Sequence, residues 1–316
     1  MAPRWPARDG RVKAIQFSRF GGPEVLELVE LPDPHPAPGQ IRVAVRAVGV
    51  NPIDWKLRSG MRGGELPQRT GGEVAGVVDE LGDGVTDAAV GDRVFGFAAG
   101  LDGAGELALS AEYAPIPPSL DFAGAAGLPV AVETAVRTLD LVGVGVGADS
   151  TVVINGAAGA VGSSAVQIAV TRGARVIGTA SPRNHDYLRS IGAEPTTYGE
   201  GLAGRLRELV PDGVDAAVDA AGGGALPALV ELAGGPEHVV TIADYAGAQA
   251  TGVRFSAGAD PGAARAVHAL KDIGELIEAG RFTLTVAQTF PLDQIAEAHR
   301  LSETGHVRGK LVLLVS

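Results

Sequence analysis

The spacing of apolar residues changes character near Pro129. Before that point, polar and apolar residues alternate over short stretches, most clearly at 40–48, and the stretches are separated by glycine and proline. Such period-two patterning predicts half-buried strands, at 12–17, 25–31, 40–48, 74–78 and 93–98. We therefore expect the first part of the chain to form an irregular β-barrel whose edges carry proline.

After Pro129, short apolar runs alternate with helical stretches, which predicts a parallel sheet with helices on both faces. The runs predict strands at 151–155, 175–179, 214–219 and 238–242 and helices at 163–172, 183–190, 202–209 and 225–233. A further helix is expected over 263–279, with Asp260 as its N-cap and Pro261 in its first turn. A helix at 292–301 and a strand at 310–315 follow, and we expect that strand to rejoin the barrel.

One junction in the second half combines a strand, a glycine turn and a helix. The β-branched run Thr151-Val152-Val153-Ile154-Asn155 leads into Gly156-Ala157-Ala158-Gly159-Ala160-Val161-Gly162, and an apolar helix follows. Glycines allow a tight turn and close approach to a pyrophosphate, and the helix amides face the anion. A buried strand–turn–helix corner is the alternative. Because the turn lies mid-chain, the nucleotide domain is expected to be inserted within another domain.

The residues after the second expected strand indicate which dinucleotide is bound. NAD-binding folds place a carboxylate there for the ribose hydroxyls, but this chain has hydroxyl, amide and guanidinium groups at Thr179, Ser181, Arg183 and Asn184. Such groups suit a 2′-phosphate, so the sequence favours NADP(H). Taken alone, Arg183 is equally consistent with a solvated residue in a helix's first turn.

Composition narrows the function classes. The 316 residues carry a formal net charge of −11 and no concentrated basic stretch, which argues against nucleic acid as a partner. There is no cysteine, which excludes disulfides, thiolate zinc sites and a cysteine nucleophile. No stretch predicts a membrane span. Residues 1–11 hold no apolar core of a secretory signal, so we expect a flexible leader and a cytoplasmic protein.

Six pieces of the chain follow one another in a characteristic order: Val12-Lys13-Ala14 with Gly21-Gly22-Pro23-Glu24-Val25-Leu26, Gly49-Val50-Asn51-Pro52-Ile53-Asp54-Trp55-Lys56, Gly76-Val77-Val78 with Gly91-Asp92-Arg93-Val94, Leu128-Pro129 with Thr134-Ala135, the glycine turn, and Gly305-His306-Val307-Arg308-Gly309-Lys310-Leu311-Val312. In these pieces the chain resembles the zinc-independent medium-chain dehydrogenase/reductase superfamily, in its quinone oxidoreductase and enone reductase branch. The resemblance covers about residues 12–316.

The resemblance implies an α/β protein in which a GroES-like β-barrel catalytic domain carries an inserted Rossmann domain. The expected boundaries are 12–128 plus 282–316 for the catalytic domain and 129–281 for the doubly wound, NADP-binding domain. Substrate would bind in a cleft between them, with specificity set by loops 56–70, 98–106 and 244–262. The similar family often pairs through the edge of its Rossmann sheet, which implies a homodimer.

The sequence also indicates whether a metal is bound and whether the chain is a short-chain reductase. Zinc-dependent relatives have a histidine where this chain has Gly72, and a cysteine ligand that this chain lacks, so no metal is expected. Short-chain reductases use a Tyr-x-x-x-Lys pair, and none of the four tyrosines, at 113, 187, 198 and 245, has a lysine four residues later.

Without a metal, hydride from NADPH must go to an acceptor that is already electrophilic, such as an enone or a quinone. The resemblance makes Asn51, Asp54 and Lys56 the catalytic candidates. Asn51 would donate its amide to the substrate carbonyl, Lys56 would stabilise an enolate or quinol oxygen, and Asp54 would orient Lys56 or relay a proton. Alternatively, Asn51 caps a turn and the other two form a surface pair.

Further cofactor contacts are implied by the resemblance. Thr134 and the pair Ala243 and Asp244 are expected at the nicotinamide end. Tyr198 is expected beside the 2′-phosphate, and Ala220 beside the adenosine. His306 and Arg308 would fold back on the cofactor, or simply form a surface turn. The glycine turn itself contributes Gly156, Ala158, Gly159, Ala160, Val161 and Gly162.

The sequence therefore predicts an NADPH-dependent reductase of enones or quinones. One alternative is an enoyl-thioester reductase of polyketide or fatty-acid assembly. Its acidic carrier protein would need a basic patch, for which the sequence offers Lys56, Arg58, Arg62 and Arg69. The other alternative is a non-catalytic NADPH-binding protein.

Overall fold

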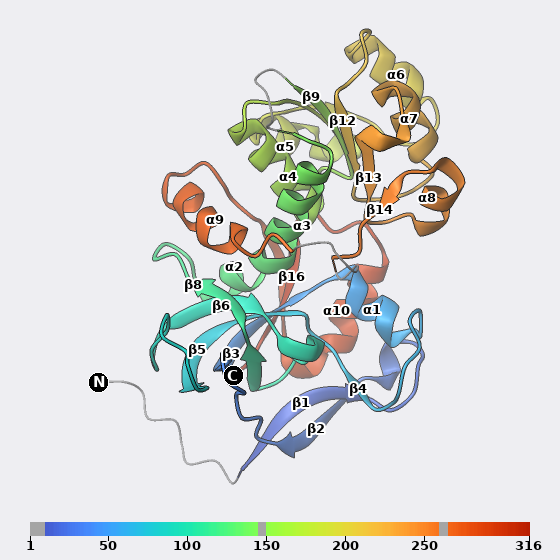
Figure 1. Cartoon of the computed structure of the whole chain (residues 1–316). Coiled ribbons are helices and arrows are strands. Elements are labelled where there is room, and N and C mark those ends of the chain that lie inside the picture. Colours follow the sequence, from blue (N-terminus) through green and yellow to red (C-terminus); the bar gives the residue numbers. More distant parts are fainter. Residues whose placement is uncertain (1–9, 145–149, 259–264) are drawn as a thin grey trace. The chain divides into compact units, whose positions relative to one another are not determined.

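The computed structural model describes residues 10–144, 150–258 and 265–316 (Figure 1). Most of the expected leader and the expected N-cap Asp260 lie outside these residues. The chain divides into two compact units: unit 1 contains 1–130, 270–278 and 284–316, and unit 2 contains 131–269 and 279–283. Among the described residues, no helix is long and apolar enough to cross a membrane.

Unit 1 is built on two sheets. A small sheet has the order β2-β1-β4, and a larger one has the order β15-β16-β3-β5-β6-β8, with β7 also pairing β3. The strands are β1 Arg11–Phe17, β2 Glu27–Pro32, β3 Ile41–Val50, β4 Gln68–Arg69, β5 Glu73–Leu81, β6 Arg93–Phe97, β7 Leu107–Ser110, β8 Glu112–Pro115, β15 Val286–Pro291 and β16 Lys310–Leu314.

The central strand β3 is apolar because it is covered on both faces. Eight of its ten residues are buried, whereas the edge strand β2 buries none. Strand β5 approaches β3 very closely at Gly76, where a Cβ would lie 2.2 Å from the Ala44 carbonyl oxygen. A side chain at Gly76 would therefore force the two strands apart.

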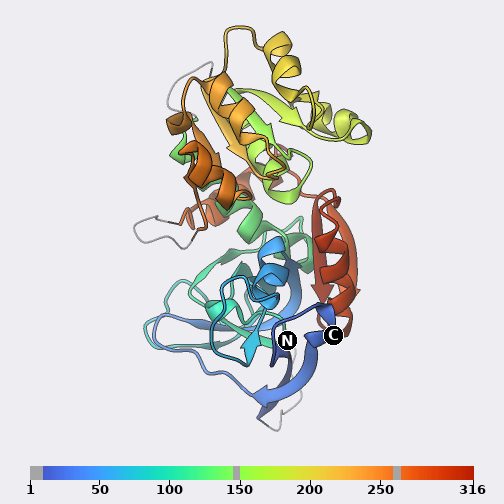
Figure 2. The same cartoon turned by 90° about the vertical axis from the view of Figure 1, so that its right-hand side faces the viewer.

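The C-terminal strand β16 pairs antiparallel with β3, from Leu311 opposite Val50 to Leu314 opposite Ala47. This confirms the expectation that the last strand rejoins the barrel. Helix α10, Ile295–Glu303, lies against β16 (Figure 2), and Ile295 and Ala298 join Leu311 in one apolar cluster. Strand β15 was not predicted, because its mostly exposed residues show no apolar alternation.

The remaining helices of unit 1 are short. They are α1 Pro52–Arg58, α2 Phe122–Ala126, and the 3₁₀ turns η1 Pro23–Val25, η2 Ala99–Leu101 and η5 Leu292–Gln294. Helix α9, Ala269–Glu278, begins later than predicted, and its residues 270–278 group with unit 1 rather than with the nucleotide domain. The reason is local, since Glu278 accepts hydrogen bonds from the Ser119 amide and hydroxyl, at 3.1 and 2.7 Å.

Unit 2 is a parallel sheet with the order β11-β10-β9-β12-β13-β14 (Figure 1). Its strands are β9 Thr151–Asn155, β10 Arg175–Thr179, β11 Ala193–Thr196, β12 Ala216–Asp219, β13 Val239–Thr241 and β14 Arg254–Phe255. In chain order this is 3-2-1-4-5-6, the doubly wound arrangement that the alternation of strands and helices predicted. Chain order reverses between β9 and β12, and in such sheets ligands bind where it does.

Helix α3, Leu128–Leu141, precedes the first of these strands. The strands are connected by α4 Ala160–Thr171, α5 His185–Ser190, α6 Leu202–Leu209, α7 Leu226–Ala233 and α8 Tyr245–Thr251, with 3₁₀ turns η3 Pro182–Asn184 and η4 Pro236–His238. The sequence did not predict β11, β14 or α8. These elements are short, and β11 and β14 lie at the two sheet edges, where little apolar patterning is needed.

Candidate functional site

The glycine turn in unit 2 uses its three glycines differently. Gly156 has φ +80°, and a Cβ there would lie 2.6 Å from the Ala221 Cβ. A Cβ on Gly162 would lie 2.2 Å from the Gly156 carbonyl oxygen. At Gly159 the nearest atom to such a Cβ is 3.5 Å away, an ordinary contact. Internal packing therefore requires Gly156 and Gly162 but not Gly159, whose missing side chain leaves room for a ligand to approach the backbone.

Helix α4 begins at this turn, and no side chain caps its N-terminus. Gly159 is the N-cap and provides no side-chain acceptor. The first-turn amides of Ala160, Val161 and Gly162 have no acceptor within the helix, and the helix dipole adds positive potential there. Together with the open approach at Gly159, this arrangement suits a pyrophosphate.

Four neighbouring strands of unit 2 each end in a buried polar residue. These residues are Thr179 of β10, Asn155 of β9, Asp219 of β12 and Thr241 of β13, and all are at most 2% exposed. Thr179 Oγ1 donates to Asn155 Oδ1 at 2.5 Å, and Asn155 Nδ2 donates to Asp219 Oδ1 at 2.8 Å. Thr241 Oγ1 donates to Asp219 Oδ2 at 2.7 Å. A hydrogen-bonded row thus crosses the carboxyl edge of the sheet.

Sequence reasoning assigned no role to Asn155, Asp219 or Thr241. The signal was present, because the polar last residue of each of these strands directly follows buried apolar residues. A polar residue that ends several parallel strands is a mark of the sheet edge at which ligands bind.

Most of the predicted cofactor contacts in unit 2 follow these strand ends. Ser181, Arg183 and Asn184 lie at η3 after β10, where Asn184 Nδ2 donates to Ser181 Oγ at 3.3 Å. Tyr198 follows β11 and is 53% exposed. Ala220 follows β12, and its amide donates to the Asn155 carbonyl at 3.0 Å. The strand order brings these segments to one edge of the sheet; their contacts with a cofactor stay a prediction.

Two further predicted contacts follow β13, and one lies in α3. The amides of Ala243 and Asp244 both donate to Thr241 Oγ1 at 3.1 Å. Thr134 is 7% exposed and donates to Glu133 Oε2 at 3.3 Å. The remaining two, His306 and Arg308, are exposed residues of unit 1 between α10 and β16.

The catalytic candidates of unit 1 lie where β3 ends and α1 begins. Asn51 is the N-cap of α1 and forms a capping box, in which its backbone amide donates to Asp54 Oδ2 at 2.7 Å. Thr70 Oγ1 donates to Asp54 Oδ1 at 3.4 Å. Burial of Asp54 raises its pKa to about 6, although the Asn51 amide favours the charged form; the negative charge of Glu73 adds to the rise.

The Asn51 side chain is held by a buried ion pair that the sequence analysis did not find. Lys310 Nζ contacts Glu73 Oε1 and donates to Asn51 Oδ1 at 2.6 Å. Asn51 Nδ2 donates to Glu73 Oε1 at 2.8 Å, and the Val130 amide donates to Glu73 Oε2 at 2.7 Å. Both charged side chains are at most 2% exposed, so each charge depends on the other.

Lys56 has a different environment from the one expected. Its ammonium lies 5.7 Å from the centroid of the Trp55 ring, a cation–π arrangement. Within the described residues, Asp54 is bonded to Asn51 and Thr70 and forms no ion pair with Lys56. The expected orientation of Lys56 by Asp54 is therefore absent from this structure. No three His, Asp or Glu side chains among the described residues form a cluster suited to a metal ion.

Two family models and several known proteins match this chain. Residues 37–136 match the alcohol dehydrogenase GroES-like domain, and residues 192–313 match the zinc-binding dehydrogenase family. The chloroplastic NADPH-dependent alkenal/one oxidoreductase of Arabidopsis thaliana is 32% identical over 320 residues, covering 96% of this chain and 79% of the relative. A quinone oxidoreductase structure from Coxiella burnetii is 32% identical with a TM-score of 0.85, covering 97% of this chain and 100% of the other.

The chain belongs to the medium-chain dehydrogenase/reductase superfamily. Its homologues are quinone and enone oxidoreductases of that superfamily, which confirms the resemblance drawn from the sequence motifs. The doubly wound domain of this superfamily binds a nicotinamide dinucleotide, and unit 2 is that domain here.

Other superfamily relatives match over less of their own length. Rat quinone oxidoreductase is 41% identical over 174 residues, which are 54% of this chain and 53% of the relative. A spectinabilin polyketide synthase system protein of Streptomyces orinoci is 37% identical over 310 residues, 93% of this chain and 14% of the relative. The chain thus spans about half of the first and a small part of the second.

Two of the four basic residues that the sequence offers to a carrier-protein partner are withdrawn from the surface. Arg58 is only 2% exposed, because its guanidinium donates to the Gly21 carbonyl and contacts His299 Nδ1 and Glu303. Arg69 is half-buried and pairs with Asp102. Arg58 is buried because α1 packs on α10, so the side chains of α1 do not all face solvent.

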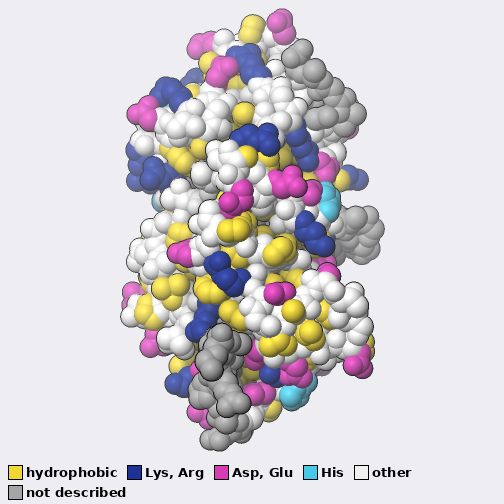
Figure 3. All heavy atoms as spheres, turned by 90° about the vertical axis from the view of Figure 1, so that its left-hand side faces the viewer, with side chains coloured by type: hydrophobic (Ala, Val, Ile, Leu, Met, Phe, Trp, Pro, Cys, Tyr) yellow, Lys and Arg dark blue, Asp and Glu magenta, His cyan; other side chains and the backbone are white. Residues whose placement is uncertain are grey.

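His299 of α10 is likewise buried, at 1% exposure. Burial and the neighbouring Arg58 lower its pKa to about 3. On the face of the molecule in Figure 3, acidic and basic side chains are interspersed rather than gathered by sign.

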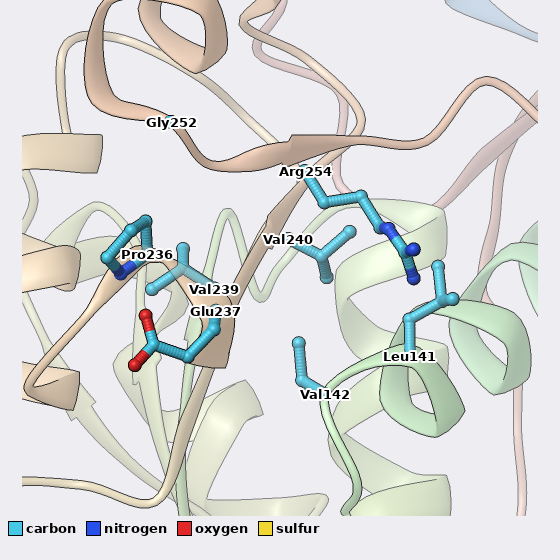
Figure 4. A pocket seen from close by; sticks show the side chains of 8 residues that line it. All are labelled: Leu141, Val142, Pro236, Glu237, Val239, Val240, Gly252 and Arg254. Carbon is cyan, nitrogen blue, oxygen red and sulfur yellow. The ribbon is translucent and has the colours of Figure 1, made fainter.

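A hollow of about 320 Å³ in unit 2 lies away from the strand-end row (Figure 4). Its lining comes from the end of α3 and from the amino ends of β13 and β14, as with Leu141, Val239 and Arg254. Because ligands of doubly wound sheets bind at the carboxyl ends of the strands, we do not assign this hollow to the cofactor.

Proposed function

We propose that this chain is an NADPH-dependent, zinc-independent oxidoreductase that transfers hydride to an enone or a quinone. One observation supports the binding of a dinucleotide. Gly159 lies at the start of α4, where no side chain caps the helix, and packing inside unit 2 does not require a glycine there. The homologues named as quinone and alkenal/one oxidoreductases support the proposed reaction.

The residues of unit 2 would bind and orient the cofactor. The first-turn amides of α4 bind the pyrophosphate, and the open backbone at Gly159 allows its approach. When bound, the reduced nicotinamide supplies the hydride. Every further requirement of the reaction falls on side chains that bind the acceptor and stabilise the charge that develops on its oxygen.

Asn51 is the donor to that oxygen. Its Nδ2 carries two hydrogens, of which Glu73 takes one, and the second is directed to the substrate carbonyl. Lys310 on Oδ1 and Glu73 on Nδ2 fix which way the amide points, so the donor is oriented before substrate binds. Lys56 stabilises the enolate or quinol oxygen electrostatically. Asp54 holds Asn51 in position by accepting a hydrogen bond from the Asn51 backbone amide.

We infer that the cofactor is NADP(H) rather than NAD(H), because Ser181 and Arg183 follow β10 where a carboxylate would bind the ribose hydroxyls of NAD. Dissociation constants for NADPH and NADH, measured by quenching of tryptophan fluorescence, test this. We expect NADPH to bind more tightly in the unmodified protein, and Arg183→Ala to weaken NADPH by about tenfold or more while changing NADH little. Equal affinities in the unmodified protein would contradict the assignment.

The reaction itself is tested by NADPH consumption with a panel of enones and quinones, with product analysis. The proposal predicts turnover with members of at least one of the two classes. Tight NADPH binding without reduction of any panel member would favour a non-catalytic binding protein.

An enoyl-thioester reductase is the second candidate, and its support is the 37% identity to the Streptomyces orinoci polyketide synthase protein. The burial of Arg58 counts against docking of an acidic carrier protein at α1. A comparison of an acyl thioester with the enone panel separates the two. Homodimer formation and a cytoplasmic location are part of the proposal, and sedimentation velocity tests the former.

A further inference from the structure

Asp219 is the centre of the polar row at the carboxyl edge of unit 2. Its side chain is fully buried. Oδ1 accepts from Asn155 Nδ2 at 2.8 Å and from the amides of Ala221 and Gly222 at 3.1 and 2.7 Å. Oδ2 accepts from Thr241 Oγ1 at 2.7 Å. An ionised carboxylate only accepts hydrogen bonds, so every neighbour must present a donor to it.

That requirement fixes the direction of one hydrogen-bond chain. Because Asn155 must present Nδ2 to Asp219, its Oδ1 faces Thr179 and accepts the Thr179 hydroxyl at 2.5 Å. A hydroxyl has one hydrogen, so the Thr179 oxygen is then an acceptor, and it receives the Gly156 amide at 3.0 Å. The chain thus runs from the carboxylate to the first residue of the glycine turn.

A second arm runs through Thr241 by the same logic. Thr241 gives its hydrogen to Asp219, and its oxygen accepts the amides of Ala243 and Asp244 at 3.1 Å each. One buried carboxylate therefore fixes backbone amides in the three loops that follow β9, β12 and β13. The loops after β9 and β12 belong to the two strands between which the chain order of the sheet reverses.

We propose that Asp219 is the positioning residue of the dinucleotide site, and that Thr179 acts through the Gly156 amide rather than on a 2′-phosphate. This inference rests on the proposed function. It assigns Thr179 to the shape of the pyrophosphate turn, which NADPH and NADH share. Selection between the two coenzymes is left to Ser181 and Arg183.

The test compares Thr179→Val, which removes the hydroxyl at nearly constant volume, with Thr179→Ser, which keeps it. Dissociation constants for NADPH and NADH are measured by fluorescence, and the melting temperature of the cofactor-free protein is recorded. We expect Thr179→Val to weaken both coenzymes about tenfold with their ratio unchanged, and Thr179→Ser to restore both. Thr241→Val, on the second arm, should also weaken both.

Thr138→Val is the matched control. Thr138 is fully buried in the same unit, and its hydroxyl donates to the Thr134 carbonyl at 2.7 Å. It should lower the melting temperature without changing either dissociation constant. If Thr179→Val weakens NADPH alone, or weakens neither coenzyme, or weakens both only as much as Thr138→Val does, the inference is overturned. If the unmodified protein binds neither coenzyme, the proposed function fails, and the inference with it.

Discussion

Lys310 Nζ lies 2.6 Å from Asn51 Oδ1, although the two residues are 259 positions apart. The antiparallel pairing of β16 with β3 brings them together, because Leu311 lies opposite Val50. Glu73 arrives from β5, the neighbour of β3 on its other side. The C-terminal strand therefore completes the polar cluster around the first catalytic candidate.

Breaking the buried ion pair should cost much of the stability of unit 1. Lys310→Met leaves the Glu73 carboxylate buried without its cation, and we expect the free energy of unfolding to fall by about 3–5 kcal/mol. Adding Glu73→Gln should recover part of that loss, because no uncompensated charge is left. Urea unfolding followed by circular dichroism measures both.

The exposed pair of Arg175 and Glu194 is the control, since its side chains are 46% and 48% exposed. Arg175→Met should change the free energy of unfolding by less than about 1 kcal/mol. Equal losses of unfolding free energy at the two sites would show that burial does not increase the contribution of the Lys310–Glu73 pair to stability.

The glycines of the turn should separate folding from binding. Gly162→Ala places a Cβ 2.2 Å from the Gly156 carbonyl oxygen and should lower the melting temperature. Gly159→Ala makes only a 3.5 Å contact, so the melting temperature should hold while NADPH binding weakens about tenfold or more. Thermal unfolding and fluorescence titration of both variants test this. A Gly159→Ala protein that binds NADPH normally would refute the role given to this residue.

The buried Asp54 predicts a specific dependence of stability on pH. Its pKa is raised from 3.8 to about 6, so between these values the folded state holds a proton that the unfolded state has released. Rising pH therefore destabilises the folded state over this window, by roughly 3 kcal/mol in total. The Asn side chain of Asp54→Asn does not titrate. The free energy of unfolding of the unmodified protein, minus that of Asp54→Asn, should therefore fall by roughly 3 kcal/mol between pH 4 and pH 7.

Denaturant unfolding at several pH values measures that difference. A flat Asp54→Asn difference across the window would mean that Asp54 ionises with its ordinary pKa in the folded protein.

The sequence predicted the parts of this molecule that local patterns encode. The glycine turn follows an apolar strand and precedes an apolar helix, so strand, turn and helix were all visible before the fold. Contacts between residues that lie far apart in the sequence could not be predicted. Asp219, Asn155 and Thr241 are polar ends of separate strands, and only the strand order shows that they form one row. Burial of Arg58 likewise depends on α10, which lies far away in sequence.

The most direct test of the account is transfer of deuterium from NADPH labelled at the transferable C4 position to a simple enone. We predict one deuterium at the β-carbon of the saturated ketone for each NADPH oxidised, as measured by mass spectrometry and NMR. The hydrogen at the α-carbon should come from solvent. Oxidation of NADPH with no deuterium in the product would contradict direct hydride transfer by this protein.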